Sequence, residues 1–115
     1  MAHHEEILEN LIQELRRGSL VLFVLSQMSQ KQYGYSLLQN LTDKGMSIEP
    51  GTLYPLMRRL EKQGLLDSQW DVDAGRPRKY YLLSTDGVVV LEKMKEEWQQ
   101  LVQQMNAVLH DQADE

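Results

Sequence analysis

Half of the cationic side chains in the sequence lie in one stretch, residues 50–80. Six of the twelve Lys and Arg residues fall there against four acids, a local balance of +2 in a chain whose net charge is −5. Cations interspersed with tyrosine and threonine are suited to contacts with phosphates and base edges. Because nucleic-acid binding depends on where charge is concentrated, this segregation outweighs the acidic overall balance.

The first part of the basic stretch has the spacing of an amphipathic helix. Its apolar arc, which would face a core, consists of Leu53, Leu56, Met57 and Leu60. Its outward arc consists of Tyr54, Pro55, Arg58, Arg59 and Lys62. Pro50 and Gly51 are expected to form a turn before the helix, with Thr52 as its N-cap, and Gly64 to end it. Pro55 would then be the third helical residue, where its missing N–H has no intrahelical partner to lose.

The second part of the stretch alternates in polarity, which predicts a strand over residues 66–73 with one wet face. Turn residues follow, and residues 78–83 predict a returning strand, so we expect a two-stranded hairpin. Its basic tip carries Arg76, Arg78 and Lys79 around Pro77. Trp70 is expected in the core. Tyr80 and Tyr81 lie on opposite strand faces, so one should be packed and the other half exposed.

Helical spacing also predicts helices near the start of the chain. Residues 5–16 carry an apolar stripe with acids opposite. The stripe consists of Ile7, Leu8, Leu11, Ile12 and Leu15. Residues 20–28 fit a central core helix better than a buried strand, because helical spacing continues to Met28. Gly18 and Ser19 either bend the chain between these helices, which we favour, or lie within one longer helix at a cost of about 1 kcal/mol relative to alanine.

A further helix is predicted over residues 36–44, followed by Gly45 as a left-handed cap. Its apolar face consists of Leu37, Leu38 and Leu41. Residues 29–35 are expected to form a turn before it. The alternating residues 46–49 could form a very short strand.

The last part of the chain carries apolar residues spaced alternately three and four apart. They are Leu91, Met94, Trp98, Leu101, Met105 and Val108. Residues 84–86 offer a cap and a first-turn acid, so a helix is predicted over residues 85–110, followed by a disordered tail at 111–115. The spacing is that of a heptad seam lasting just over two heptads. Self-association is favoured, and packing within one subunit is the alternative.

The predicted fold class is mainly α with a small β-hairpin. Helix, helix, basic helix and hairpin is the order of a winged helix, whose third helix lies in the DNA major groove and whose hairpin tip reaches the backbone or minor groove. The strings QYGYSLLQNL, EPGTLYPLMRRLEKQGLL and GRPRKYYLLSTDG closely resemble the PadR family of transcriptional regulators. The resemblance covers roughly residues 15–87, and the chain looks like the short branch of that family. It implies a winged-helix DNA-binding domain at residues 1–84 and a dimerisation helix at 85–110.

The resemblance implies that Tyr33, Gly34 and Tyr35 open the second helix of the DNA-binding unit and that GTLYP opens the recognition helix, with Leu53 buried. The predicted DNA-binding residues are Tyr35, Ser36, Gly51, Thr52, Tyr54, Pro55, Arg58, Arg59, Arg76, Arg78 and Lys79. Helix N-termini, hydroxyls and cations of this kind bind phosphates or base edges. A lone cation is as often a solvated surface residue, and the sequence does not show which residues contact bases.

Members of the family dimerise through the last helix with help from the first, and the resemblance extends this to the present chain. The predicted interface consists of Leu8, Leu11, Leu15, Leu91, Met94, Trp98, Leu101, Met105 and Val108. Trp98 also matches the position at which multidrug-sensing members stack planar aromatic molecules. Trp98 and Phe23 are therefore candidate effector-binding residues, with Val24 a further candidate. For Phe23 and Val24 simple core packing is the alternative.

We therefore expect a homodimeric, sequence-specific regulator that binds a pseudo-palindromic operator in double-stranded DNA. The resemblance implies a repressor, released by a small planar aromatic effector at the dimer interface. The alternative is a winged-helix module whose basic face binds an acidic protein and not an operator.

Other classes find little support in the residues. His3, His4 and His110 lie near the chain ends without metal-ligand companions, and no nucleophile elbow, phosphate-cradling glycine loop or dinucleotide fingerprint is present. No catalytic residue, metal site or cofactor is expected. The absence of cysteine, of a basic signal segment and of an apolar run of about 18 residues is consistent with a cytoplasmic protein that does not enter a membrane.

Overall fold

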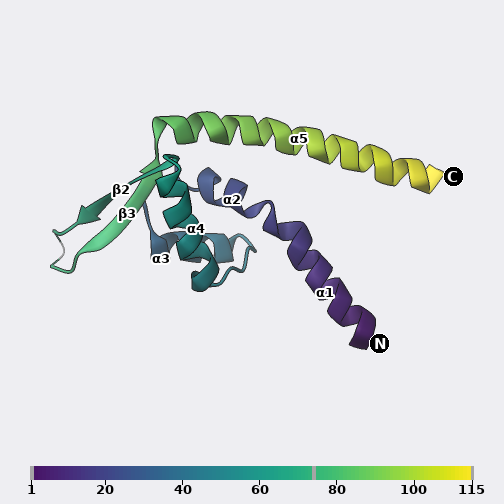
Figure 1. Ribbon diagram of the computed structural model, residues 1–115, viewed down its shortest axis with the longest axis horizontal. Coiled ribbons are helices and arrows are strands. Elements are labelled where there is room, and N and C mark those ends of the chain that lie inside the picture. The colour runs from purple at the N-terminus through teal and green to yellow at the C-terminus, as the bar shows by residue number, and fades with distance from the viewer. Residues whose placement is uncertain (1, 74, 115) are drawn as a thin grey trace.

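The computed structural model describes residues 2–73 and 75–114 as a small body from which two helical arms extend (Figure 1). The elements in chain order are α1 (Ala2–Arg17), α2 (Leu20–Ser26), β1 (Gln32–Tyr33), α3 (Gly34–Asp43), α4 (Pro50–Lys62), β2 (Leu66–Asp71), β3 (Arg78–Leu83) and α5 (Thr85–Asp114). The body contains α2, α3, α4 and the sheet. The arms α1 and α5 leave it on one side and diverge, which gives extents of 63 × 36 × 23 Å.

Apolar side chains from α2, α3, α4 and the base of the sheet form one core. The predicted inner face of α4 is confirmed, because its four apolar residues are at most 9% exposed. Leu37 and Leu41 from α3 meet Val24 and Leu25 from α2 in the same cluster. Helices α2 and α3 and the base of the sheet therefore fix the inner face of α4 and leave its opposite face exposed.

Helix α4 begins three residues earlier than predicted. Glu49 is its N-cap, with extended backbone (φ −76°, ψ 143°), and Pro50 lies in the first turn. The prediction of Thr52 as N-cap, after a Pro50–Gly51 turn, is wrong because a residue that precedes proline is held extended, which is the conformation of an N-cap. Pro55 consequently lies inside the helix and leaves the carbonyl of Gly51 without its usual donor.

The sheet has three antiparallel strands in the order β1-β3-β2, where a two-stranded hairpin was predicted. Strand β1 pairs Gln32 with Tyr81 and Tyr33 with Tyr80, inside a segment predicted as a turn. Two residues are too few to show alternation, so only the pairing reveals this strand. Residues 46–49 do not form the short strand considered for them.

The two faces of the hairpin differ in what covers them. Leu66 and Tyr81 lie on the inner face and are buried, and Tyr80 lies on the outer face, which confirms that one tyrosine is packed and the other partly exposed. Trp70 is also on the inner face but is 64% exposed, so its predicted place in the core is wrong. The hairpin extends past the helices, and only its base covers the core (Figure 1).

Helix α5 is joined to the body by a tight connection. The hydroxyl oxygen of Ser84 caps α5 by accepting a hydrogen bond from the N–H of Gly87 (2.9 Å), and the same hydroxyl donates to the carbonyl of Gly64 (2.6 Å). A Cβ atom on Gly87 would lie 2.1 Å from the carbonyl oxygen of Leu65. The start of α5 therefore requires glycine at this position.

The arms are longer than the spacing predicted. Helix α5 continues to Asp114 and thus includes residues 111–114 of the predicted disordered tail, with no proline or glycine to end it, and residue 115 lies outside the described residues. Helix α1 spans Ala2–Arg17, and the favoured break at Gly18 and Ser19 is confirmed. Helix α2 ends at Ser26, two residues before the predicted end. The predicted left-handed cap at Gly45 is confirmed, with φ of 88°, and Gly64, predicted to end α4, is also left-handed, with φ of 81°.

Candidate nucleic-acid interface

The outward face of α4 is open to solvent along its length. Five of the predicted DNA-binding residues of this helix are exposed, namely Gly51, Thr52, Pro55, Arg58 and Arg59. Neither Arg58 nor Arg59 forms an ion pair within residues 2–73 and 75–114. Two guanidinium groups one residue apart on an exposed helix present unneutralised charge and a fork of donors, as binding to phosphate or guanine requires.

The beginnings of α3 and α4 are in contact through Tyr54. The ring of Tyr54 covers Gly34 so closely that a Cβ there would lie 2.9 Å from its Cε1 atom. This contact brings Tyr35, which is 71% exposed, and Ser36 beside the first turns of α4. The structure thus groups the predicted residues of both helices at one end of the body, and Tyr54 itself is only partly exposed.

The cations of the hairpin are in different surroundings. Arg76 in the turn and Arg78 on β3 are exposed. The ammonium of Lys79 lies 3.0 Å from the Oε1 atom of Glu61 on α4, and its side chain is only 30% exposed. Lys79 therefore points back to the body and is not part of an open basic tip. Nothing in the sequence indicated this contact with Glu61.

A cluster of polar and aromatic side chains covers the outer face of the sheet. Tyr33 donates its hydroxyl to Asp71 (2.6 Å), and the guanidinium of Arg78 lies 4.4 Å from the centre of the Tyr33 ring. Lys31 lies 4.7 Å from the centre of the Tyr80 ring in a second cation–π contact. The contact with the Tyr33 ring therefore holds the Arg78 side chain against the outer face of the sheet.

The sequence did not predict a site role for Tyr33, Asp71, Lys31 and Tyr80 on the outer face, or for Glu61 and Ser68 on the inner face. Tyr33 and Asp71 are 38 positions apart, and only the strand order β1-β3-β2 brings them together. Had residues 32–33 been recognised as a strand, the register on β3 would have predicted that contact.

Hydrogen bonds lower the pKa of both acids in these clusters. The hydroxyl of Ser68 and then the ammonium of Lys79 lower the pKa of Glu61, against the effect of burial. The hydroxyl of Tyr33 and then the backbone N–H of Asp73 lower the pKa of Asp71. Both carboxylates are therefore ionised at neutral pH, and the Glu61 carboxylate offsets the charge of Lys79. Among the predicted DNA-binding cations, Arg58, Arg59, Arg76 and Arg78 form no ion pair in the described part of the chain.

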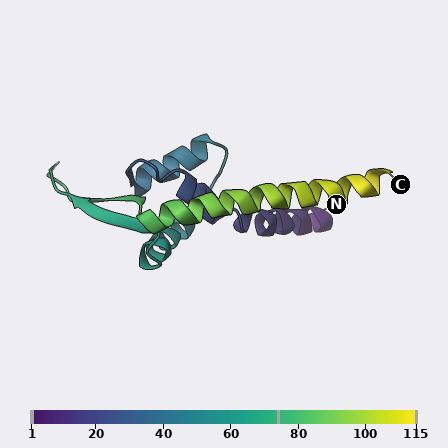
Figure 2. The ribbon, with the colours of Figure 1, turned by 90° about the horizontal axis from the view of Figure 1, so that it is seen from above.

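A second surface of the molecule is apolar and lies between the arms. Figure 2 shows α1 and α5 pointing the same way from the body, and most of the predicted interface residues lie on their exposed faces. These are Leu8 (53% exposed), Leu11 (55%), Leu15 (76%), Trp98 (47%), Leu101 (47%), Met105 (46%) and Val108 (57%). Met94 is half-buried. Leu91 is only 7% exposed and packs in the core, so it is not accessible to a second chain, contrary to the prediction.

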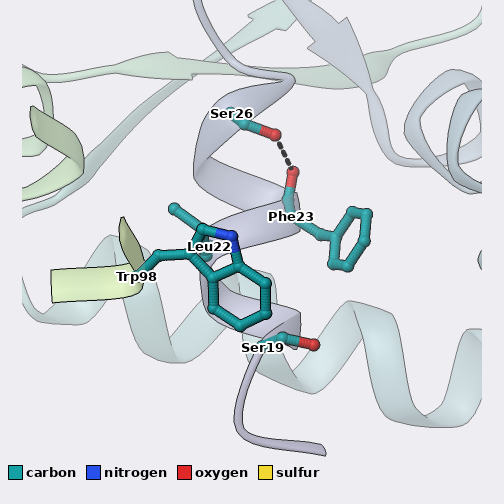
Figure 3. A pocket seen from close by; sticks show the side chains of 5 residues that line it. All are labelled: Ser19, Leu22, Phe23, Ser26 and Trp98. Carbon is teal, nitrogen blue, oxygen red and sulfur yellow. Dashed lines mark hydrogen bonds between the residues drawn. The ribbon is translucent and has the colours of Figure 1, made fainter. Parts of the chain in front are cut away.

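Trp98 and Phe23, the two predicted effector residues, line the same pocket (Figure 3). The pocket has a volume of about 270 Å³, and its other residues are Ser19, Leu22 and Ser26. Both serine hydroxyls donate to backbone carbonyls of their own segment, so the remaining surface is largely apolar. A wider groove of about 770 Å³ continues from this pocket along α5. Val24 is fully buried in the core.

No helix in residues 2–73 and 75–114 combines the length and apolar character needed to cross a membrane.

The three-helix body, the hairpin that projects from it and the exposed basic face of α4 define a winged-helix DNA-binding protein. Residues 21–93 match the transcriptional regulator PadR-like family. The chain belongs to this family, and it is a DNA-binding transcriptional regulator. The resemblance seen in the three sequence strings is thereby confirmed.

Individual relatives agree with this assignment. A PadR-family regulator from Eggerthella lenta has a crystal structure similar to this fold, with a TM-score of 0.90, 45% sequence identity and coverage of 95% of this chain and 97% of that one. A PadR-like regulator from Bacillus cereus has a TM-score of 0.75 at 29% identity, covering 84% and 96%. The transcriptional regulator Rv3488 of Mycobacterium tuberculosis is 32% identical over 95 residues, which are 82% of this chain and 89% of the relative.

Proposed function

We propose that the chain acts as a homodimeric repressor that binds a pseudo-palindromic operator and is released by a small planar aromatic molecule. The observation that carries the DNA-binding part is the outward face of α4. Its inner residues are fixed in the core, while Arg58 and Arg59 are exposed without ion-pair partners in the described chain. Membership of a family of DNA-binding regulators favours this function over a module that binds an acidic protein.

The contacts in the proposed complex divide between two parts of the body. The first turns of α3 and α4, with Tyr35, Thr52 and Tyr54, are suited to phosphates and to the base edges nearest the helix ends. Arg58 and Arg59 extend these contacts along the major groove. Arg76 and Arg78 on the wing are suited to backbone or narrow minor-groove contact.

Dimerisation is supported by the apolar surface of the arms. Seven of the predicted interface residues on α1 and α5 are between 46% and 76% exposed, far more than a small monomer usually leaves open in one region. A second copy of the chain, related by twofold symmetry, would cover these residues and present two α4 helices about one turn of DNA apart. The twofold relation accounts for the proposed operator symmetry, and the distance between the α4 helices for the spacing of its half-sites.

The effector part of the proposal rests on the pocket between α2 and α5. Trp98 and Phe23 provide aromatic surface there, and the serine hydroxyls are already bonded, so a flat apolar molecule fits the chemistry. Because the same helix α5 would carry the dimer contacts, a molecule that separates α5 from α2 changes the distance between the two α4 helices.

The DNA-binding part is tested by selecting genomic fragments with the protein and then measuring affinity for the selected duplex over a range of salt concentrations. We expect a steep negative slope, and Arg58→Ala to cost about 1–3 kcal/mol of binding free energy with relaxed preference at one base pair. Lys95→Ala is the matched control, since it removes the same charge from α5 at a distance from α4. A flat salt slope, or equal losses for both substitutions, would contradict the assignment.

The effector part is tested by tryptophan fluorescence. The chain has two tryptophans, so Trp70→Phe leaves Trp98 as the only reporter, and Trp98→Phe leaves Trp70. A planar tricyclic dye should quench the first variant saturably and leave the second almost unchanged. Equal quenching of both variants would show that no specific pocket is filled.

The direction of regulation is tested with a reporter gene placed behind the selected operator. Expression should fall when the protein is supplied and return when the quenching dye is added. Activation by the protein would contradict repression and leave operator binding intact.

A further inference from the structure

One carboxylate connects the recognition helix to both strands of the wing. Glu61, in the last turn of α4, accepts a hydrogen bond from the hydroxyl of Ser68 on β2 through Oε2, and from the ammonium of Lys79 on β3 through Oε1 at 3.0 Å. The side chains of Glu61 and Lys79 are only 31% and 30% exposed. Charge-assisted hydrogen bonds in such partly covered sites are stronger than those on an open surface.

This contact lies where the covered part of the hairpin ends. Ser68 is opposite Tyr81, which is buried, whereas Lys79 is opposite Trp70, which is 64% exposed. Both Ser68 and Lys79 are on the inner face of the hairpin, toward α4. Glu61 therefore holds the wing at the boundary between the packed base and the projecting tip.

The position of the tip depends on the angle of the hairpin at this boundary. Arg76 lies three residues beyond Lys79, at most about 10 Å along the chain. A small rotation of the hairpin at Glu61 is magnified over that length. Since Lys79 is held by Glu61, the exposed cations that the wing can bring to DNA are Arg76 and Arg78.

We propose that Glu61 is a positioning residue that fixes the angle between the wing and the recognition helix, so that α4 and Arg76 reach the same DNA site together. This inference rests on the DNA-binding function and adds a residue that does not itself contact DNA. An acid beside a DNA-binding face weakens binding by repulsion if charge is its only effect. Glu61 instead strengthens binding through the wing, and this difference in sign makes the proposal testable.

The first test is a double-mutant cycle on the full chain, with a random-sequence DNA duplex as the probe. Arg76→Ala should lower the salt slope by about 1 in the unsubstituted protein. In the E61A background Arg76→Ala should leave the slope almost unchanged, because the wing no longer holds Arg76 at the backbone. Arg58→Ala, on α4 itself, should lower the affinity by the same factor in both backgrounds.

Two further variants separate position from charge. The side chain of Asp67 on β2 makes no hydrogen bond or ion pair in the described chain. Asp67→Asn therefore removes a negative charge without loosening the wing. It should tighten DNA binding and preserve the full effect of Arg76→Ala. Glu61→Gln keeps an acceptor for Ser68 and should retain part of that effect. If Arg76→Ala has equal effects with and without Glu61, the positioning role is rejected.

The second test does not depend on DNA. The chain has no cysteine, so Lys44→Cys on the body and Val72→Cys on the wing allow two spin labels to be placed. Their distance distribution should be narrow in the otherwise unsubstituted chain, broad with Glu61→Ala and narrow with Asp67→Asn. An unchanged width with Glu61→Ala overturns the inference, whereas failure of the unsubstituted protein to bind the duplex would reject the DNA-binding function and leave this measurement to decide the role of Glu61.

Discussion

The body and the arms of this molecule use the same kinds of side chain in opposite ways. In the body, Leu25, Leu41 and Met57 are completely buried within one chain. In the arms, Leu15 and Val108 are 76% and 57% exposed, although their spacing is just as regular. The body therefore completes its core alone, whereas the apolar surface of the arms is suited to burial by a second chain.

The polar contacts follow the same division. The ion pair between Lys79 and Glu61 joins a helix to a strand at a partly buried site, 18 positions apart in the sequence. The ion pair between Lys95 and Glu92 lies within one turn of α5, with both side chains more than half exposed. Pairs of the second kind contribute little to stability. The body is thus held by contacts between elements, while each arm depends on its own helix and on what covers it.

Truncating a side chain in the core of the body is expected to have the largest effect, and it tests the contrast between the buried body and the exposed arms. Leu41→Ala should lower the free energy of unfolding by about 2–5 kcal/mol, because it opens a cavity among fully buried neighbours. Leu15→Ala removes the same atoms from a side chain that is 76% exposed, and should cost less than about 1 kcal/mol at concentrations where the chain is monomeric. Urea titrations of both variants measure the difference. Equal losses would show that α1 is packed within its own chain.

A charge placed in the arms is expected to have the next largest effect, on association and not on folding. Leu101→Asp should raise the dimer dissociation constant by at least about a hundredfold, since burying an unpaired carboxylate costs several kcal/mol. Gln103→Asp, on the opposite side of α5, should leave it within a few fold. Sedimentation reports association, and circular dichroism should show that the body stays folded. A dimer that tolerates Leu101→Asp would place the interface elsewhere.

The two joints between body and arms should also respond differently. Gly87→Ala at the start of α5 should destabilise the chain by about 1–3 kcal/mol, because its Cβ would meet the carbonyl oxygen of Leu65 at 2.1 Å. Gly18→Ala between α1 and α2 meets nothing within 4 Å and should be neutral or slightly stabilising. Thermal unfolding of the two variants gives the comparison. If they behave alike, α5 is not fixed to the body in the way described.

The smallest effect concerns the outer face of the wing. The hydrogen bond to Asp71, then burial and the charge of Asp71, raise the pKa of Tyr33 above 10.0. Because the pKa is raised on folding, the contribution to stability is complete below pH 10.0 and is lost as the pH rises through the folded value. Asp71→Asn should lower the pKa of Tyr33, as followed by NMR of the ring carbons. No change would mean that the Tyr33–Asp71 contact does not persist in solution.

Residue spacing was sufficient to predict most of the elements of the body. The bounds of β3, the four buried residues of α4 and the glycines 45 and 64 that end α3 and α4 follow from rules that act over a few residues. The PadR resemblance then associated these elements with DNA. The predicted residues of α3 and α4 lie together because the helices that carry them pack on one core.

The errors arose where a contact depends on distant parts of the chain. Strand β1 exists through its pairing with β3, and Trp70 is exposed because the hairpin is longer than the core beneath it. Lys79 has the same local signature as the other wing cations, yet Glu61 holds it. Leu91 continues the heptad spacing of α5, yet it packs in the core of its own chain. The error at Thr52 is different, since the effect of Pro50 on Glu49 was available in the sequence.

Periodicity and charge alone were enough to establish that this chain has a basic helix, a hairpin and a long apolar seam, because these patterns depend on neighbours three or four residues away. They report which side of an element is apolar, but not what covers it or how far the cover extends. Packing in three dimensions settled those questions: it divided one heptad seam into a buried start at Leu91 and an open continuation from Trp98. It also gave Lys79 a carboxylate partner and left Arg76 exposed, since ion pairs and burial depend on distances in space and not along the chain.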